Sequence, residues 1–375
     1  MSTTLQIPLE LLPKDGRFGS GPSLVRQDQT DRLVDANTPR SPHLIMGTSH
    51  RKPPVKNMVG EVREMIARLF SVPEGYEVVL GNGGSTAFWA VAVTSLIERR
   101  SAHATFGEFG NKFYEESARA PFLEAPARFD APAGELAVIG EAEGADVFAY
   151  PHHETSTGVL SPITRAKNGL TVVDATSIAG GIEVDIAQTD AYYFAPQKCF
   201  ASDGGIWFAI LSPAAIERAR KLHAEEGRWM PQILDLSIAI DNSVKNQTLN
   251  TPALATLMML HAQLEWMLAL GGLEATAKRS RTSTDLIYNW AEKREFATPF
   301  VQNPDWRSPV VATIDFEGVE ASEISAVLRA NGVVDVDSYR KLGRNQLRIG
   351  AFPSVDPKDV EALLASIDYV VENLS

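Results

Sequence analysis

The sequence predicts an α/β protein with a large domain, in which helices cover a mostly parallel central sheet, and a smaller C-terminal α+β domain. Two observations lead to this fold class. Between about residues 70 and 212, short apolar runs that end in Gly, Asp, Pro or His alternate with helical patterns. Several of these runs are almost continuously apolar, which is typical of strands buried on both faces of a parallel sheet. Beyond residue 310 the same alternation returns on a smaller scale.

The large domain is predicted to follow an irregular N-terminal arm. Residues 1–22 contain closely spaced Pro and Gly residues and form that arm. The first helix is predicted over Met58–Phe70, where apolar residues recur at steps of three and four. The strands expected after it are Glu77–Leu80, Ala102–Phe106, Asp146–Tyr150, Leu170–Val173, Ala191–Phe194 and Ile206–Leu211.

A long apolar segment, Leu254–Leu270, marks the end of the large domain. Its polar residues, among them His261 and Glu265, predict an amphipathic helix rather than a membrane span. The helix should end at Gly271 and Gly272. We therefore expect a large domain over residues 23–268 and a small domain over residues 269–375.

Alternating strands and helices are also predicted in the small domain. Val310–Phe316 and Gln346–Phe352 read as strands, and Ala321–Ala330 reads as a helix that stops at Asn331-Gly332. A last helix should begin at Asp356-Pro357, with Asp356 as the N-cap and proline at the first helical position.

The composition narrows the class of protein. The chain has 375 residues, 44% of them apolar and 22% charged, as in ordinary globular proteins. Its net charge of −12 disfavours a general nucleic-acid binder, which needs clustered Lys and Arg. The one cysteine, Cys199, allows no intrachain disulfide and fits a reducing compartment. Without an evident secretory signal in residues 1–19, we expect a cytoplasmic protein that binds no membrane.

A glycine-rich loop, Gly81–Thr86, is the first candidate binding site. It follows a predicted strand and precedes a predicted helix, where free N–H groups and the helix dipole attract an anion. It matches neither the dinucleotide fingerprint nor the P-loop, because no lysine follows the glycines. A tight turn with a Ser or Thr helix cap explains the loop about equally well.

Two further residues come at the ends of predicted strands. Asp174 follows a buried strand, where ligands bind in open α/β sheets, although acids there are often turn residues. Lys198 follows an aromatic strand. An apolar setting would lower its pKa and make the amine nucleophilic, although the side chain could instead extend to solvent. A phosphate-binding loop, an acid and a lysine, in this order, are what pyridoxal phosphate requires.

Several motifs in one order make the resemblance to a family specific. They are Phe18–Ser23, Ser49-His50-Arg51, Gly81–Thr86, His153–Gly158, Asp174, Gln197-Lys198, Asn250-Thr251-Pro252 and the strand of Arg348. With these motifs the chain resembles the fold-type I pyridoxal-phosphate enzymes, and within them the phosphoserine aminotransferases of the actinobacterial type, nearly from end to end. The cofactor that this resemblance implies is pyridoxal 5'-phosphate.

The resemblance also implies roles for individual residues. Lys198 would be the Schiff-base lysine and proton shuttle, and Asp174 the partner of the pyridine nitrogen. Phe109 would stack on the ring where many relatives have Trp, and Thr155 would lie near its phenolic oxygen. The remaining cofactor ligands would be Gly84, Ser85, Thr86 and Gln197, together with Asn250 and Thr251 from the neighbouring subunit of a homodimer with shared active sites.

The substrate residues implied by the resemblance are His50, Arg51 and Arg348. Arg348 would hold the α-carboxylate, because a guanidinium matches a carboxylate bidentately. His50 and Arg51 would face the substrate phosphate or the glutamate side chain. The usual His-Arg pair is replaced near Tyr339-Arg340-Lys341, so Arg228, Arg340 and Lys341 are alternative phosphate contacts.

The implied reaction is transamination between L-glutamate and 3-phosphohydroxypyruvate, which gives O-phospho-L-serine and 2-oxoglutarate in serine biosynthesis. Relatives also act on a four-carbon phosphorylated keto acid in pyridoxine biosynthesis. A small-amino-acid aminotransferase, such as an alanine- or serine-glyoxylate enzyme, is an alternative of the same fold. A cysteine desulfurase would need a mobile nucleophilic cysteine, and a non-catalytic regulator would need an added DNA-binding module. No metal site is expected.

Overall fold

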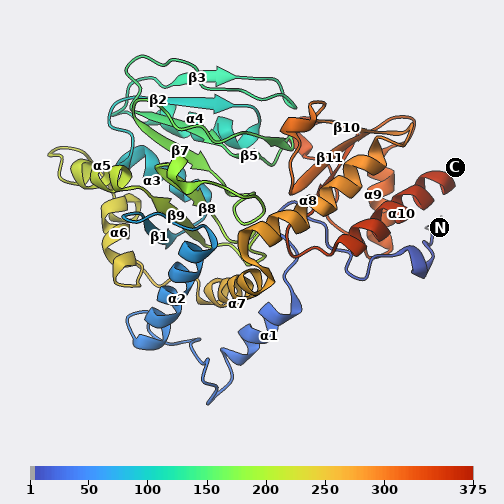
Figure 1. Ribbon diagram of the computed structural model, residues 1–375, viewed down its shortest axis with the longest axis horizontal. Coiled ribbons are helices and arrows are strands. Elements are labelled where there is room, and N and C mark those ends of the chain that lie inside the picture. Colours follow the sequence, from blue (N-terminus) through green and yellow to red (C-terminus); the bar gives the residue numbers. More distant parts are fainter. Residues whose placement is uncertain (1–4, 375) are drawn as a thin grey trace.

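A seven-stranded sheet forms the centre of the larger part of the molecule in the computed structural model, which describes residues 5–374 (Figure 1). The strands lie in the order β1-β9-β8-β7-β4-β2-β3. β9 runs antiparallel to β1 and β8, and the other neighbouring pairs are parallel, so the predicted mostly parallel sheet is confirmed. The strands are β1 (Glu77–Asn82), β2 (Ser101–Thr105), β3 (Ala127–Asp130), β4 (Val147–Pro151), β7 (Leu170–Asp174), β8 (Ala191–Phe194) and β9 (Ile206–Leu211).

Helices cover both faces of this sheet because successive strand residues point to opposite sides. In β8, Tyr192 packs into the hydrophobic cluster on one face and Tyr193 into the cluster on the other. The first face is covered by α2 (Pro53–Leu69) and α7 (Leu254–Leu270), with α1 (Gln27–Asp35) against α7. The second face is covered by α3 (Ser85–Ser95), α4 (Glu108–Arg119), α5 (Pro213–His223) and α6 (Leu236–Val244).

Leu254–Leu270 is a helix with the predicted bounds, but the prediction that one face of it is polar and exposed is wrong. Residues 256–264 are all buried, because α7 packs between α1, α2 and α8. The polar His261 is accommodated by Glu61 of α2, whose Oε2 lies 2.8 Å from the His261 Nε2. The structure also contains strands too short to be predicted, β3 and the two-stranded ladder of β5 (His153–Glu154) and β6 (Val159–Leu160).

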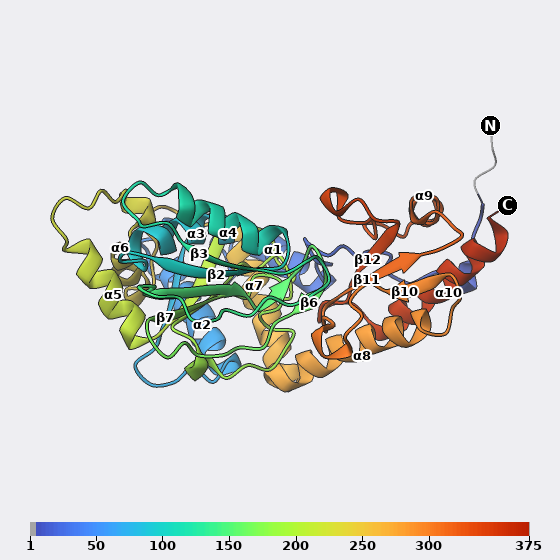
Figure 2. The same ribbon diagram turned by 90° about the horizontal axis from the view of Figure 1, so that it is seen from above.

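The C-terminal part has its own antiparallel sheet, in the order β10-β11-β12, and lies beside the larger part (Figure 2). Its elements are α8 (Gly272–Ala291), β10 (Ala297–Pro299), β11 (Val311–Phe316), α9 (Ala321–Ala330), β12 (Gln346–Gly350) and α10 (Pro357–Asn373). The N-terminal arm joins this part, since Ile7 and Phe18 are buried in its hydrophobic cluster. The exact domain boundaries remain a prediction.

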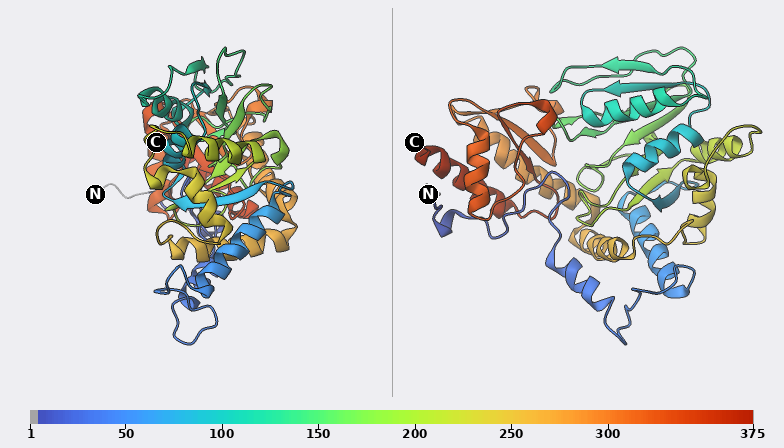
Figure 3. Two further views of the ribbon diagram at one scale, coloured as in Figure 1. Left: turned by 90° about the vertical axis from the view of Figure 1, so that its left-hand side faces the viewer. Right: turned by 180° about the vertical axis from the view of Figure 1, so that it is seen from behind.

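α7 and α8 meet at 90°, at the predicted Gly271-Gly272 ending. Among the described residues no single helix is long and apolar enough to cross a membrane, and this bent pair passes that test only when the two helices are taken together. α1 lies against α7, and the loop after α1 projects from the body (Figure 3, right).

The parallel strands end at one edge of the sheet. Asn82, Asp174 and Phe194 are the last residues of β1, β7 and β8. Loops at this edge are where ligands bind in open α/β folds. The three motifs singled out for chemistry therefore come together through the topology of the sheet.

Candidate active site

Lys198 lies in the turn after β8, with its amine enclosed by the N-terminal segment. The Nζ donates a hydrogen bond to the main-chain oxygen of Ser20 at 2.9 Å. A Cβ on Gly21 would lie 1.7 Å from this Nζ, so only glycine leaves room for the amine. Burial, with a smaller contribution from the charge of Arg348, lowers the pKa of Lys198 to about 8. A neutral, nucleophilic amine is therefore accessible near neutral pH.

Asp174 is the last residue of β7 and is held from two directions. Its Oδ2 accepts a hydrogen bond from the Trp89 Nε1 at 3.0 Å, and its Oδ1 accepts one from the Thr176 backbone N–H at 3.0 Å. The Thr176 hydroxyl contacts the same Oδ1 and lies 2.6 Å from the Ser85 Oγ. Trp89 and Thr176 are absent from the predicted set. Trp89 could have been found from its position four residues after Ser85, on the same face of a helix.

The glycine-rich loop forms an open cradle at the start of α3. Gly83 has a φ of +106°, and its N–H donates to the Gly205 oxygen at 3.0 Å. Gly84 is the N-cap, and no atom of the described residues would lie within 4 Å of a Cβ there. The first backbone N–H groups of α3, at Ser85 and Thr86, can therefore be approached by an anion.

One wall of the site is built by Glu154. Its buried carboxylate accepts hydrogen bonds at 3.0 Å from the backbone N–H groups of Phe109 and Gly110, in the first turn of α4. Burial raises the pKa of Glu154, and the donors, including the Ser156 hydroxyl, oppose that rise. These bonds hold the start of α4, with the half-buried Phe109, against Glu154, the residue before the predicted Thr155.

Arg348 connects the C-terminal part of the molecule to this wall of the site. From β12 its Nη1 donates to the Thr155 oxygen at 3.2 Å, and its guanidinium lies 5.2 Å from the centre of the Tyr339 ring. The Tyr339 ring is in turn 6.3 Å from that of Phe109. The predicted Arg348 therefore faces the wall that carries Phe109 and Thr155.

Unpaired polar atoms around the site are available to a ligand. Four buried atoms around it lack a hydrogen-bond partner within residues 5–374: the Ser23 Oγ, the His153 Nε2, the Gln197 Oε1 and the Arg348 Nε. Leaving such groups unpaired is costly unless something else binds them. Together with the open cradle and the amine of Lys198, they fit the phosphate, ring and aldehyde of pyridoxal phosphate.

His50, Arg51, Asn250 and Thr251 form a second group, apart from Lys198. The Thr251 Oγ1 lies 3.1 Å from the His50 Nδ1, and the Arg51 Nη2 donates to the Leu249 oxygen at 3.1 Å. The Thr251 oxygen accepts from the Asn82 Nδ2 at 3.0 Å. Within the described part of the chain, no hydrogen bond or ion pair connects His50 or Arg51 with Lys198, Asp174 or Arg348.

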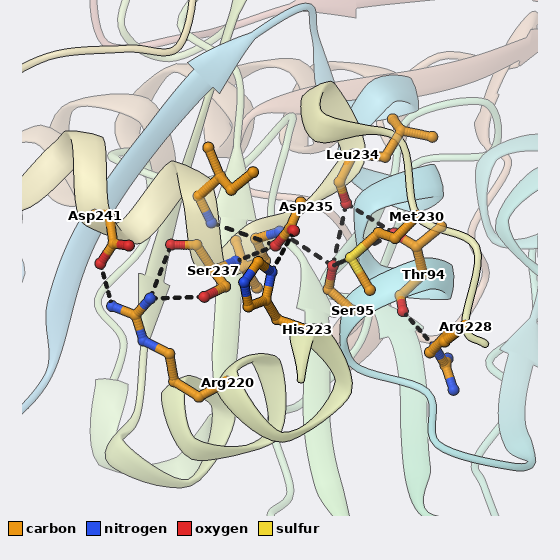
Figure 4. A network of polar contacts seen from close by, with 12 residues as sticks. Thr94, Ser95, Arg220, His223, Arg228, Met230, Leu234, Asp235, Ser237 and Asp241 are labelled. Carbon is orange, nitrogen blue, oxygen red and sulfur yellow. Dashed lines mark hydrogen bonds and ion pairs between the residues drawn. The ribbon is translucent and has the colours of Figure 1, made fainter. Parts of the chain in front are cut away.

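Arg228 is one of three alternative residues predicted to contact the substrate phosphate, and for Arg228 this prediction is wrong. Its guanidinium is bound to the oxygen of Thr94, at the C-terminal end of α3 (Figure 4), and to the oxygen of Ile97 just beyond it. That end lies about 15 Å from the cradle at the start of the helix, at 1.5 Å per residue. Arg340 is exposed, and Lys341 pairs with Glu108, next to Phe109 in the site wall.

Cys199 does not support a desulfurase. Its side chain is fully buried, and its Sγ lies 3.5 Å from the Ser177 oxygen. Burial raises the pKa of the thiol far above its ordinary value, which disfavours the reactive thiolate. No group of three or more His, Cys, Asp or Glu residues that could hold a metal ion occurs among the residues that the structure describes.

The chain is similar to known proteins over most of its length. The family model "Aminotransferase class-V" matches residues 138–338. The chain is 53% identical to the phosphoserine aminotransferase of Nocardioides sp., over the full length of both chains. It is 52% identical to a putative phosphoserine aminotransferase of Mycobacterium leprae, over 100% of this chain and 99% of that one.

The fold is shared with a solved structure. A phosphoserine aminotransferase from Cytophaga hutchinsonii superimposes with a TM-score of 0.87, at 22% identity, over 96% of this chain and 100% of the other. At that identity the likeness concerns the fold alone. It matches the arrangement of a large sheet domain beside a smaller C-terminal part.

Proposed function

Because the chain belongs to the phosphoserine aminotransferase family of class-V aminotransferases, we propose that it transfers the amino group of L-glutamate to 3-phosphohydroxypyruvate. The products are O-phospho-L-serine and 2-oxoglutarate, and the cofactor is pyridoxal 5'-phosphate. The observation that carries the proposal is geometric. The Lys198 amine is bound to the Ser20 oxygen in the turn after β8, Asp174 ends the neighbouring strand β7, and Arg348 reaches the Thr155 oxygen from β12.

The residues of this chain would bind the cofactor and move the proton. When bound, pyridoxal phosphate supplies an aldehyde that takes up the amino group and a ring that accepts electron density. Lys198 would hold the aldehyde and then carry the proton on its Nζ, because its pKa of about 8 allows both gain and loss of a proton. Asp174 would keep a proton on the ring nitrogen.

The cationic residues would select the substrates. The unpaired Nε of Arg348 can bind the α-carboxylate that glutamate and phosphoserine share. His50 and Arg51 would bind the second anionic group of each substrate. This group is the phosphate of phosphoserine or the side-chain carboxylate of glutamate, and simple amino acids lack it. A site of this kind disfavours alanine or serine, which carry no second anion.

The proposal includes a homodimer in which each site takes residues from both chains. His50 contacts Thr251, and Arg51 bonds to the oxygen of Leu249, the residue before Asn250, so a neighbouring subunit would receive these residues together. The His50 Nε2 and the Asn82 Oδ1 have no hydrogen-bond partner among residues 5–374. Polar groups of a second chain, or its bound cofactor, could satisfy both atoms.

Exposed apolar residues support the same assembly. Val34 on α1, Leu44 in the loop after it and Val244 at the end of α6 are 69%, 38% and 57% exposed. One side of α1 packs against α7, and the loop after α1 extends from the body (Figure 3, right). Exposed apolar groups on a projecting segment are typical of a protein interface. The compartment that fits this enzyme is the cytoplasm.

A panel of amino donors and keto acids tests the substrate assignment. Purified holoenzyme should convert glutamate with 3-phosphohydroxypyruvate far faster than with the same three-carbon acid without phosphate. A four-carbon phosphorylated keto acid in the panel tests the additional activity. Equal rates with the phosphorylated and the unphosphorylated three-carbon acid would overturn the proposal and favour a small-amino-acid aminotransferase.

A further inference from the structure

Helix α3 contacts Asp174 directly through Trp89 and indirectly through Ser85, one turn earlier. Trp89 lies four positions after Ser85, so both side chains are on the same face of the helix. The Trp89 side chain is buried, and its indole N–H donates to the Asp174 Oδ2 at 3.0 Å. The ring is held by Phe113 of α4, at 6.3 Å between centroids and 13° between planes.

The second oxygen of Asp174 is connected to the same helix through Thr176. The Thr176 backbone N–H donates to the Oδ1, and the Thr176 hydroxyl lies between this oxygen and the Ser85 Oγ, 2.6 Å from the latter. The four residues Ser85, Thr176, Asp174 and Trp89 therefore form one polar chain that closes through a single turn of α3. This chain joins the phosphate cradle to the acid at the end of β7.

The hydrogen bond from Trp89 to Asp174 is not needed to pack the core. A buried indole N–H needs an acceptor, and here it binds the carboxylate at the end of β7, beside Lys198 in the candidate site. An ionised carboxylate accepts about four hydrogen bonds, so these donors leave capacity for a further one from a ligand. With a donor on each oxygen, the carboxylate cannot rotate without losing a hydrogen bond.

We propose that Trp89 is a positioning residue, which fixes the Asp174 carboxylate in the orientation that meets the ring nitrogen of the cofactor. Through Ser85 and Thr176, the same turn of α3 sets that carboxylate relative to the phosphate cradle. The inference rests on the proposed cofactor, and it does not depend on which keto acid is the substrate.

The test compares Trp89→Phe with a matched variant, Trp290→Phe. Trp290 is also buried and also donates its indole N–H to an aspartate, the Asp368 Oδ1, at 2.9 Å, but in the C-terminal part. Both variants lose one Trp–Asp hydrogen bond, so both should lower the melting temperature. Only Trp89→Phe should change the absorption spectrum of the bound cofactor and weaken cofactor affinity, by about ten-fold.

Kinetics separate positioning from substrate binding. Asp174 serves the cofactor and not one substrate, so Trp89→Phe should slow the half-reactions with glutamate and with phosphoserine by the same factor, with KM nearly unchanged. A wild-type cofactor spectrum and affinity in Trp89→Phe, with only the melting temperature reduced as in Trp290→Phe, would overturn the proposal. Spectrum and affinity are measured without substrate, so a wrong substrate assignment leaves this test intact.

A second variant covers the case in which Trp89→Phe does not fold. Thr176→Val keeps the side-chain shape and removes the hydroxyl between Asp174 and Ser85. Thr284→Val, in α8, removes a buried hydroxyl that bonds only its own helix and serves as the control. Thr176→Val should weaken cofactor binding while Thr284→Val should not, and equal affinities in the two variants would contradict the proposed network.

Discussion

The amine of Lys198 donates a hydrogen bond to the main-chain oxygen of Ser20, 178 residues earlier in the chain, at 2.9 Å. The segment that carries Ser20 is held at both ends. On one side the Gly350 N–H donates to the Phe18 oxygen at 2.7 Å, and on the other the Ser23 N–H donates to the Gln197 oxygen at 2.8 Å. The N-terminal segment therefore connects the strand of Arg348 to the turn of Lys198.

This contact predicts the effect of a methyl group at position 21. In Gly21→Ala the new Cβ would occupy the place of the Lys198 amine, and the φ of +138° would add strain. Covalent capture of the cofactor, measured by borohydride reduction and mass spectrometry, should be largely lost. Gly318→Ala is the control, because Gly318 also has a positive φ, of +75°, but has no described atom within 4 Å of its Cβ position. Equal capture in both variants would contradict the placement of Gly21.

Capture of the cofactor by the apoenzyme should depend on pH through Lys198. A lysine with an ordinary pKa of 10.5 is almost fully protonated at pH 8, whereas burial lowers the pKa of Lys198 to about 8. The neutral fraction, and with it the capture rate, should rise with pH through a midpoint near 8 and level off above it. In Arg348→Gln the loss of the neighbouring positive charge should raise the Lys198 pKa and move the midpoint to higher pH. An unchanged midpoint in that variant would contradict the coupling.

Arg348 and Arg51 should affect different properties. Arg348→Gln should slow the transamination of every amino-acid substrate, because all of them share the α-carboxylate. The loss should be about 2–4 kcal/mol, or roughly 30- to 1,000-fold in kcat/KM, as for a lost charge-assisted contact. Arg51→Gln should weaken the binding of phosphoserine and of glutamate and leave the affinity for the cofactor unchanged. The control is Arg344→Gln, since Arg344 pairs with Asp315 and is 45% exposed. Loss of cofactor in Arg51→Gln would contradict its substrate role.

Mixed dimers test whether the site is shared. A chain with Lys198→Ala and a chain with both Arg51→Ala and Thr251→Ala should each be poorly active. After subunit exchange, half of the dimers are mixed and each has one intact site of two, so activity should recover to at most about a quarter of wild type. If the mixture shows only the average of the two variants, the site is built within one chain. Active enzyme that elutes as a monomer would contradict the dimer directly.

The strands, and the functional residues at their ends, could be predicted because the apolar pattern of each strand lies within a few neighbouring residues. The run before Asp174 is apolar except for Thr171, and β7 has that strand with Asp174 as its last residue. Ala321–Ala330 is a helix with the predicted bounds, since its apolar spacing and the Asn331-Gly332 stop are both local signals. The same local rule fails for α7, because burial on all sides depends on its neighbours and not on its own spacing.

Contacts between distant segments could not be predicted from local pattern. The approach of His50 to Thr251, 201 residues later, depends on how the loop before α2 lies against the segment before α7. The bond from Trp89 to Asp174 depends on which strand α3 covers, which requires the strand order. Arg228 was a plausible phosphate contact by residue type, and only the packing of its guanidinium against the end of α3 shows that it is structural.

Mapping the reduced cofactor adduct tests the central claim most directly. Holoenzyme treated with borohydride should carry one cofactor per chain, and peptide mass spectrometry should place it on Lys198. Lys198→Ala should lose both the adduct and essentially all turnover with glutamate and 3-phosphohydroxypyruvate. An adduct on Lys341, or substantial turnover in Lys198→Ala, would contradict the account.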